Sequence, residues 1–323
     1  MNTFGRIFRV SIIGESHGPF VGVTIDGCPP GISLTADDFT TDIERRKPGA
    51  KGTTPRKEDD IPEFITGIFK DHTTGAPLTI LFKNSNTRSV DYEKQQAIPR
   101  PGHADFVAGA KFKGFQDYRG GGHFSGRLTV ALVAAGVVAK KILNTIKVNA
   151  TILEIGGEKD IEKGLQKAID AKDTIGGIVE CTVAGLPLGL GEPFFDSVES
   201  VLSHAAFSIP AVKGIEFGKG FESAKMFGSI HNDALQNMEG KTATNNAGGI
   251  VGGITNGNDL IFRIAVKPTS STPKEQITLN TETNKAEPFS VKGRHDLCIA
   301  LRVPVVLEAV TAISLTDLKF IFE

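Results

Sequence analysis

The sequence contains no tryptophan and only three cysteines among its 323 residues. Cys28, Cys181 and Cys298 lie far apart, with neither the spacing of a zinc site nor that of a disulfide framework. The chain also lacks an H-E-x-x-H motif and other metal-ligand pairs at a helical interval, so we predict no metal site. The simplest interpretation of these absences is a protein of a reducing cytoplasm.

Neither sign of charge predominates in the sequence. The 36 Lys and Arg residues nearly balance the 37 Asp and Glu residues, which leaves a formal net charge of -1. General binders of nucleic acid or of membrane surfaces need a large uncompensated basic field, so this balance argues against both kinds of partner. An anionic ligand must therefore be held by a local cluster of cationic side chains.

The chain lacks a long hydrophobic segment and an N-terminal leader pattern. Its first residues show no charged segment followed by an apolar one. Its most apolar stretch, Val130 to Ala139, is too short to span a bilayer. We therefore expect a soluble, cytoplasmic protein that does not associate with a membrane.

Glycine, in contrast, is abundant. Many of the 37 glycines lie in two blocks, RGGGHFSG at residues 119–126 and NNAGGIVGGITNG at residues 245–257. Only glycine lets the backbone turn sharply or approach a ligand closely without steric cost. Both blocks adjoin apolar segments and lack the monotony of a Ser/Gly linker, which favours ordered loops.

A weak internal repeat organises the chain. Residues 22–46 resemble residues 177–207, and each segment is typical of a strand, a turn and a helix. In both segments an alternating apolar run ends in a G-x-P-x-G turn, at residues 27–31 and 185–189. The repeat predicts two related halves.

Several helices can be predicted from capping and periodicity. Thr35 with Asp38 is a capping-box candidate, and Pro193 suits a first helical position. Residues 129–146 are rich in Ala and Val on all sides, which predicts a helix buried between two layers. A surface helix is predicted where apolar residues recur every four positions, at Ile161, Leu165 and Ile169.

The mixture of strands, helices and hairpin-like turns indicates an α+β fold. A regularly alternating Rossmann sheet is not favoured, because no G-x-G-x-x-G follows a first strand. We expect a single domain over residues 1–323, built from two pseudo-repeated halves, roughly 1–150 and 151–323.

Two loops place a histidine near a carboxylate. GESHG follows a strand-like run and puts His17 at a strand end, where catalytic groups are often held; an ordinary loop histidine is the alternative. RPGHAD combines Arg100, His103 and Asp105 on a Pro-Gly turn. That mixture is suited to binding and protonating a phosphate leaving group, but a structural turn with a surface ion pair would have the same pattern.

Three further motifs carry cations beside small or hydroxyl residues. RGGGHFSGRLT feeds the predicted buried helix, so its N–H groups and Arg127 offer an anion site, although a plain tight turn also fits. KPTSST begins at Lys267, directly after a predicted strand at residues 260–266, and gathers four hydroxyls, which suits a cofactor phosphate or merely a solvated loop. GRHD puts Arg294 beside Asp296, a candidate base.

Read in order, seven motifs together resemble the chorismate synthase family, and the match runs nearly end to end. They are GESHG, RPGHAD, RGGGHFSGRLT, IPAVKGIEFG, NNAGGIVGGITNG, KPTSST and GRHD. The resemblance implies an α/β sandwich with internal helices between antiparallel sheets, usually assembled as a homotetramer. It also implies a lyase of the shikimate pathway of aromatic amino acid biosynthesis: 5-enolpyruvylshikimate 3-phosphate loses phosphate in a 1,4-anti elimination that gives chorismate and requires reduced FMN without net oxidation.

Roles for individual residues follow from the same resemblance. His17 is expected to protonate or stabilise the reduced flavin, His103 to donate a proton toward the departing phosphate, and Asp296 to work with the flavin N5 as base. The arginines expected to grip the substrate's carboxylates and phosphate are Arg45, Arg46, Arg100, Arg127 and Arg294. The residues expected to contact the flavin are His123, Phe124, Ser125, Ala211, Gly252, Lys267, Pro268, Thr269, Ser270, Ser271 and Arg294.

The chain departs from the family pattern in one loop. The commoner family loop reads R-S-S-A-R-E-T, whereas this chain has H-F-S-G-R-L-T and keeps Ser125, Arg127 and Thr129. Side-chain contacts from His123 and Phe124 to the flavin are therefore in question, although backbone contacts could persist.

Alternative functions remain open from the sequence. A flavin-dependent reductase or a phosphate-ester hydrolase could use the same anion pocket, and a non-catalytic flavin-binding or anion-binding homologue could keep the fold without turnover. The resemblance also leaves open whether the protein reduces its own flavin with NADPH or relies on an external reductase. No segment resembles a dedicated nicotinamide site.

Overall fold

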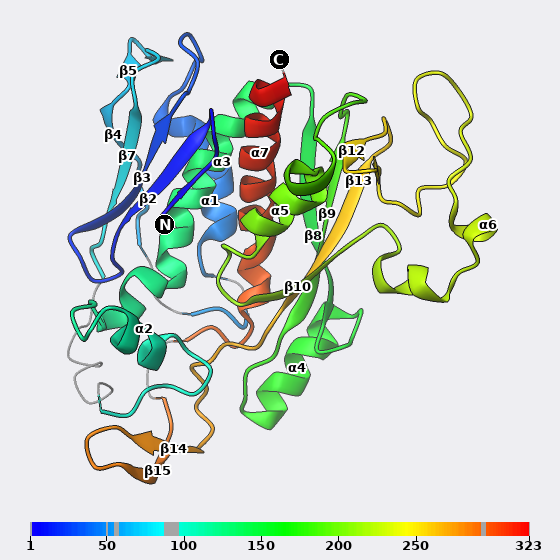
Figure 1. Cartoon of the computed structure of the whole chain (residues 1–323). Helices are drawn as coiled ribbons and strands as arrows, with labels where there is room; N and C mark the ends of the chain where they lie inside the picture. The colour runs from blue at the N-terminus through cyan, green and yellow to red at the C-terminus, as the bar shows by residue number, and fades with distance from the viewer. Residues whose placement is uncertain (1, 50, 55–57, 87–96, 292–294, 323) are drawn as a thin grey trace.

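Two antiparallel sheets enclose a layer of helices in the computed structural model of the chain (Figure 1). The structure describes residues 2–49, 51–54, 58–86, 97–291 and 295–322. The first sheet has the strand order β1-β2-β3-β7-β4, and all its neighbouring strands run antiparallel. Its strands are β1 (Thr3–Phe4), β2 (Arg9–Gly14), β3 (Phe20–Asp26), β7 (Leu78–Lys83) and β4 (Glu63–Thr66).

The second sheet belongs to the other half of the chain and has the order β10-β13-β9-β8. Its strands are β8 (Lys147–Ile155), β9 (Gly177–Ala184), β10 (Val212–Phe217) and β13 (Leu260–Val266). Leu260, Phe262 and Ile264 alternate with less buried residues along β13, because only one face of the sheet packs on the helices. The strand predicted at residues 260–266 is confirmed.

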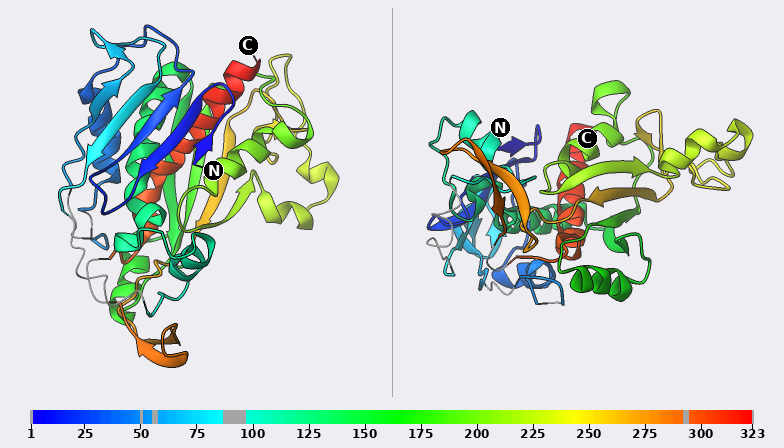
Figure 2. Two further views of the ribbon diagram at one scale, coloured as in Figure 1. Left: turned by 60° about the vertical axis from the view of Figure 1, so that its left-hand side comes forward. Right: turned by 90° about the horizontal axis from the view of Figure 1, so that it is seen from below.

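Helices α3 (Thr129–Leu143) and α7 (Val303–Phe322) lie between the two sheets and pack on each other. Helix α3 covers β3 and β7, and α7 covers β8 and β9, so the predicted sandwich with internal helices is confirmed (Figure 2). The two helices approach closely where Gly136 faces Ala309: a Cβ atom on Gly136 would lie 2.4 Å from the Cβ of Ala309. Only glycine permits this contact.

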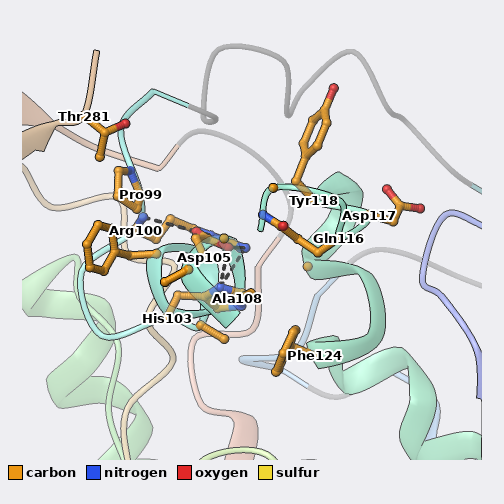
Figure 3. A pocket seen from close by; sticks show the side chains of 16 residues that line it. Pro99, Arg100, His103, Asp105, Ala108, Gln116, Asp117, Tyr118, Phe124 and Thr281 are labelled. Carbon is orange, nitrogen blue, oxygen red and sulfur yellow. Dashed lines mark hydrogen bonds and ion pairs between the residues drawn. The ribbon is translucent and has the colours of Figure 1, made fainter. Parts of the chain in front are cut away.

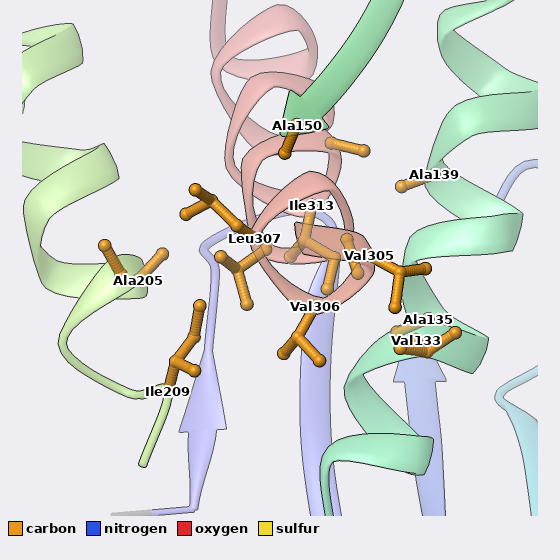
Figure 4. Packing of buried hydrophobic residues seen from close by; sticks show 14 of the residues in the cluster. Val133, Ala135, Ala139, Ala150, Ala205, Ile209, Val305, Val306, Leu307 and Ile313 are labelled. Carbon is orange, nitrogen blue, oxygen red and sulfur yellow. The ribbon is translucent and has the colours of Figure 1, made fainter. Parts of the chain in front are cut away.

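Helix α7 is a second core helix that the sequence reasoning did not predict. The segment Ile299–Phe322 is long and apolar enough to cross a membrane by length and composition. However, 78% of its apolar window is buried inside the protein, against α3, α5 (Val198–Ala206) and the second sheet. Figure 4 shows Val306, Leu307 and Ile313 of α7 within this packing. The burial identifies α7 as a core helix.

The other predicted helices are found, but one ends earlier than predicted and one begins later. Thr35 and Asp38 form the predicted capping box, at the start of a short 3-10 helix that leads into α1 (Thr40–Arg46). The predicted surface helix is α4 (Ile161–Ala171), and the buried helix at residues 129–146 is α3, which ends at Leu143. Pro193 was wrongly placed: it precedes a 3-10 turn, and α5 begins at Val198 because Ser197 caps it.

The two halves share one topology, as the repeat predicted. In the first half the sheet contains β2-β3-β7-β4 and the chain then enters α3; in the second it contains β8-β9-β13-β10 and the chain then enters α7. The treatment of residues 1–323 as a single domain stays a prediction.

The remaining elements are α2 (Asp105–Lys111), α6 (Gly228–His231), β5 (Ile68–Phe69), β6 (His72–Thr73), β11 (Ile250–Val251), β12 (Ile254–Thr255), β14 (Gln276–Asn280) and β15 (Lys285–Phe289).

Candidate active site

A cavity of about 520 Å³ lies at the N-terminal ends of α3 and α7. Thr129 of α3 and Val303 and Val306 of α7 line it, so the positive ends of both helix dipoles are directed toward it. Most of the predicted site residues also line this cavity. They are Arg46, Arg100, His103, His123, Phe124, Ser125, Arg127, Ala211, Lys267, Pro268, Thr269, Ser270, Ser271 and Asp296.

Four predicted site residues are not among those that line the cavity. His17 lies immediately behind the cavity wall. Arg45 pairs with Glu308 of α7, and Gly252 lies in the turn between β11 and β12, so neither is brought to the cavity within this chain. Arg294 lies outside the described residues. The binding roles of these residues stay predictions.

His17 is buried behind the glycine loop that follows Tyr118. A Cβ atom on Gly120 would lie 2.5 Å from the His17 ring, and Gly120 has a φ of +59°, so this position requires glycine. His123 of the same loop donates a hydrogen bond from Nδ1 to the carbonyl of Gly14 at 2.8 Å. The GESHG loop and the RGGGHFSG loop therefore form one packed unit at the cavity wall.

The RPGHAD turn forms a second wall. Asp105 accepts hydrogen bonds from Arg100 Nε at 2.7 Å and from Arg100 Nη2 at 2.8 Å. His103 Nδ1 lies 2.6 Å from Asp105 Oδ1. Burial alone would raise the pKa of Asp105, but the hydrogen bonds from Arg100 and His103 outweigh it and hold that pKa well below its usual range. Arg100 Nη1 also donates to Ser271 Oγ at 3.2 Å, which ties the turn to the KPTSST loop.

The KPTSST loop packs on the same turn. Lys267 Nζ donates to the Gly102 carbonyl at 2.9 Å and to Ser270 Oγ at 2.7 Å. Burial and the nearby Lys213 lower the pKa of Lys267. Thr269 Oγ1 is buried and has no hydrogen-bond partner among the described residues. An anionic or hydrogen-bonding ligand could satisfy both groups.

The variant H-F-S-G loop lies at the cavity as an ordered turn. Ser125 caps a short 3-10 helix by accepting a hydrogen bond from the Arg127 N–H at 3.3 Å. Phe124 is 40% exposed and packs against Phe112 with ring centroids 6.2 Å apart. His123 uses Nδ1 for the Gly14 carbonyl. His123, which replaces the Arg of the commoner loop, thus contributes an anchored imidazole. Phe124, which replaces the first Ser, contributes a partly exposed aromatic face.

Two buried arginines share one carboxylate at the centre of the site. Asp60 accepts hydrogen bonds from Arg46 Nη2 at 2.8 Å and from Arg127 Nη1. Arg46 Nη1 also donates to Thr129 Oγ1 at 3.2 Å, and Arg127 Nε donates to Asn84 Oδ1 at 2.9 Å. Burial would raise the pKa of Asp60, but the two guanidinium groups outweigh it and lower that pKa. Asp60 is therefore ionised.

Asp296 lies at the cavity edge in a network of donors. Its Oδ1 accepts a hydrogen bond from the Thr54 N–H at 2.9 Å, and its Oδ2 accepts one from Arg302 Nη1 at 3.2 Å. Arg302 Nε in turn donates to the Arg46 carbonyl at 2.9 Å. The carboxylate is thus held in one orientation by groups from two separate segments.

Sequence reasoning missed the partners that hold the predicted residues. Asp60 and Asn84 contact Arg127, and Arg302 contacts Asp296. The fold brings these side chains together, and no sequence motif marks Asp60, Asn84 or Arg302. Five cationic side chains and three carboxylates are found among the described lining residues. They are Arg46, Arg100, Arg127, Lys267, Arg302, Glu58, Asp60 and Asp296. The cavity is therefore positive although the whole chain carries a net charge of -1.

A positive cavity with histidines and carboxylates in its walls is typical of an enzyme that acts on an anionic small molecule. Comparisons with known proteins identify the family. The model of the chorismate synthase family matches residues 8–320. A chorismate synthase of Chitinophaga pinensis is 70% identical over 318 residues, covering 98% of this chain and 96% of the relative.

Other relatives agree. A chorismate synthase of Dehalococcoides mccartyi is 43% identical over 349 aligned positions, covering 98% of this chain and 96% of the relative. A crystal structure of chorismate synthase superposes with a TM-score of 0.74 and 25% identity, covering 97% of this chain and 92% of that one. The chain belongs to the chorismate synthase family. It is a lyase of the shikimate pathway of aromatic amino acid biosynthesis, and nothing in the comparisons supports a non-catalytic homologue.

Proposed function

We propose that the protein converts 5-enolpyruvylshikimate 3-phosphate to chorismate by a 1,4-anti elimination of phosphate, with reduced FMN bound and no net oxidation. The observation that carries this proposal is the excess of cationic over anionic side chains among the described residues that line the cavity. The substrate bears one phosphate and two carboxylates, which match a wall of arginine forks. Family membership makes this the reaction to test first.

Substrate binding is assigned to the arginines that the cavity exposes. Arg46 and Arg127 are held in place by Asp60, and Arg100 is held by Asp105, so each guanidinium is fixed before substrate arrives. A fixed fork loses little conformational entropy on binding an anion. Arg45 and Arg294 stay in the proposal as predicted substrate-binding residues, but no contact described here supports them.

Proton transfer is assigned to two groups from different motifs, His103 of RPGHAD and Asp296 of GRHD. His103 donates a proton toward the oxygen of the departing phosphate, which lowers the cost of expelling it. Asp296, oriented by Thr54 and Arg302, would work with the flavin N5 as the base that removes the ring hydrogen. His17, behind Gly120, is assigned to the flavin.

The residues of the cavity fit a flavin phosphate and ring. Lys267 and the buried Thr269 hydroxyl, which lacks a partner among the described residues, suit the phosphate, and the exposed face of Phe124 suits a planar ring. The remaining predicted flavin contacts are His123, Ser125, Ala211, Gly252, Pro268, Ser270, Ser271 and Arg294. When bound, reduced FMN supplies transient electron donation to a reaction whose ring hydrogen is not acidic.

An anaerobic assay with reduced FMN and the enolpyruvyl substrate tests the proposal. We expect chorismate and phosphate to form in equal amounts, and no product to form with oxidised FMN. Phosphate release without chorismate would identify a phosphate-ester hydrolase, and activity indifferent to flavin would also overturn the proposal. His103→Ala and Asp296→Ala should lower kcat far more than substrate affinity.

We also propose a cytoplasmic homotetramer, as the family resemblance implies. Analytical ultracentrifugation of the full chain tests the assembly.

Reduced FMN has two candidate sources: NADPH acting on this protein, or an external reductase. Anaerobic mixing of the protein, oxidised FMN and NADPH, followed by the flavin absorbance, separates the two: bleaching without another protein supports intrinsic reduction.

A further inference from the structure

The His103 imidazole is bracketed by two charged groups of its own turn (Figure 3). His103 Nδ1 lies 2.6 Å from Asp105 Oδ1 and 3.0 Å from Arg100 Nη2. Arg100 can only donate hydrogen bonds and an ionised Asp105 can only accept them, so Nδ1 cannot satisfy both neighbours at once. The tautomer of His103 therefore depends on which neighbour prevails.

Asp105 prevails for two reasons. Its contact with Nδ1 is the shorter of the two, and Arg100 Nη2 already donates to Asp105 Oδ1 at 2.8 Å. Asp105 also accepts hydrogen bonds from Arg100 Nε and from the Arg100 N–H, at 2.7 Å and 3.2 Å, which keep the carboxylate ionised. An ionised acceptor requires that Nδ1 carry a hydrogen.

The other ring nitrogen faces Gly121, which lines a smaller pocket of about 320 Å³ next to the cavity, and His103 lines both of them. A Cβ atom on Gly121 would be 3.5 Å from His103 Nε2 and 3.4 Å from Cε1, so this edge of the ring faces the glycine loop. Gly121 also has a φ of +81°, and the absent side chain leaves Nε2 accessible there. Besides Arg100 and Asp105, the charged groups of the described residues near His103 include Lys267, which donates to the Gly102 carbonyl, and Asp117, which lines the same pocket.

We propose that Asp105 is a positioning residue that keeps the hydrogen of His103 on Nδ1 and so makes Nε2 the nitrogen that protonates the departing phosphate. The inference rests on the proposed function. In the step, the Nε2–H bond of the imidazolium breaks as an O–H bond forms on the phosphate oxygen, and a neutral imidazole with its hydrogen on Nδ1 remains. Asp105 accepts the Nδ1 hydrogen bond throughout and is not itself protonated.

The tautomer can be measured directly. In protein labelled with ¹⁵N-histidine, the His103 signals, assigned by their loss in His103→Gln, should show a protonated Nδ1 and an unprotonated Nε2 at high pH. In Asp105→Asn the amide can donate to Nδ1, so the hydrogen should move to Nε2. An unchanged His103 tautomer in Asp105→Asn would overturn the proposal. Asp26→Asn, which removes an exposed partner of Arg9, is the matched control and should leave the signals unchanged.

Kinetics provide the second test. Asp105→Asn should lower kcat roughly 100-fold, the lower end of what a positioned acid contributes, while KM changes much less. In a His103→Ala background the same substitution should cause almost no further loss of kcat. Asp105→Glu keeps a carboxylate and should recover part of the lost kcat. Equal losses in both backgrounds, or a loss confined to KM, would show that Asp105 only holds Arg100.

Failure of the proposed function can be distinguished from failure of this inference. If His103→Ala retains full turnover, His103 is not the acid and the proposed function loses that role. The ¹⁵N signals of His103 in Asp105→Asn still decide whether Asp105 sets the tautomer.

Discussion

Two adjacent arginines at the end of α1 have different surroundings. Arg45 donates two hydrogen bonds to Glu308 of α7, at 2.8 Å and 2.6 Å, and lies away from the cavity. Arg46 donates to Asp60 and Thr129 and lines the cavity. Each arginine belongs to an ion-pair cluster, and the charge balance of the two clusters differs.

The Glu308 cluster is balanced. Glu308 accepts hydrogen bonds from Arg45, from Lys140 Nζ at 2.8 Å and from the Ala150 N–H at 3.0 Å, and Asp42 pairs with the same two cations. Burial would raise the pKa of Glu308, but Arg45 and Lys140 outweigh it and lower that pKa. Two carboxylates meet two cations here, so no charge is left for a ligand.

The Asp60 cluster is unbalanced. One carboxylate lies between two guanidinium groups, and all three side chains are at most 4% exposed. Burial, together with the charges of Arg302 and Arg127, lowers the pKa of Arg46 to about 10. The excess positive charge is costly in the free protein and is relieved when an anion binds. A cluster with equal numbers of cations and carboxylates is thus structural, whereas a buried cluster with an excess of cations marks the site.

Removing the central carboxylate should have the largest effect. Asp60→Asn leaves two buried arginines without a counter-charge, so the free energy of unfolding should fall by about 3–5 kcal/mol. Glu308→Gln should cost less, about 1–3 kcal/mol, because Arg45 and Lys140 are partly exposed and can reach water. Urea denaturation of both variants measures the difference. Equal losses would contradict the distinction between the clusters.

Substitution of the two arginines should separate catalysis from structure. Arg46→Lys loses the planar fork in a buried setting, and kcat/KM should fall roughly 10- to 100-fold, which corresponds to about 1.5–3 kcal/mol for a hydrogen bond to a charged group. Arg45→Lys, the matched control, should change kcat/KM less than about threefold, because the Arg45 side chain is 40% exposed in its pair with Glu308 and such a pair contributes little. A comparable loss in Arg45→Lys would restore its predicted role in substrate binding.

Inorganic phosphate should stabilise the site cluster selectively. At a phosphate concentration of 100 times Kd, binding to the folded state adds about 2.7 kcal/mol, a rise of a few degrees in Tm. Arg46→Gln should abolish this rise, whereas Glu308→Gln should retain it, because only the first loses a cavity cation. Differential scanning fluorimetry across a phosphate titration, with chloride at matched ionic strength, provides the measurement. A rise that persists in Arg46→Gln would place the anion elsewhere.

The smallest effect concerns acid stability. The pKa of Glu308 is lower in the folded protein than its ordinary value of 4.5, so its contribution is complete above that value and is lost as the pH falls through the folded pKa. Glu308→Gln should therefore show a shallower loss of stability below pH 4.5 than the wild type. Urea midpoints measured between pH 6 and pH 3.5 test this. Parallel curves for the two proteins would contradict the assignment.

Local features of the fold could be predicted because they depend on neighbouring residues. The capping box at Thr35 and Asp38, the strand at residues 260–266 and the all-round apolar helix α3 are examples. Helix α7 was missed because Thr311, Ser314, Thr316 and Asp317 interrupt its apolar pattern, and only its buried position reveals a core helix. Pro193 misled because Ser197, four residues later, makes the better cap.

The residues of the site were predictable as motifs but not as an arrangement. Arg45 and Arg46 are neighbours in the sequence, and the family resemblance assigned both to the substrate. A helix rotates successive side chains by about 100°, so adjacent residues face different partners. Asp60 and Arg302 were missed because most of their partners are remote in sequence. Arg46 and Arg127 lie 14 and 67 positions from Asp60, and the Arg46 carbonyl lies 256 positions from Arg302.

The sequence by itself determined the family, the α+β class, the two related halves and the loops that carry the chemistry, since these depend on local patterns and on the order of motifs. Only the tertiary structure decided which charges are paired off and which remain at the cavity. That distinction depends on distances between segments remote in sequence and on burial, which sets the cost of an unpaired charge. Cations paired with carboxylates form a neutral cluster at Glu308 and a positive site at Asp60.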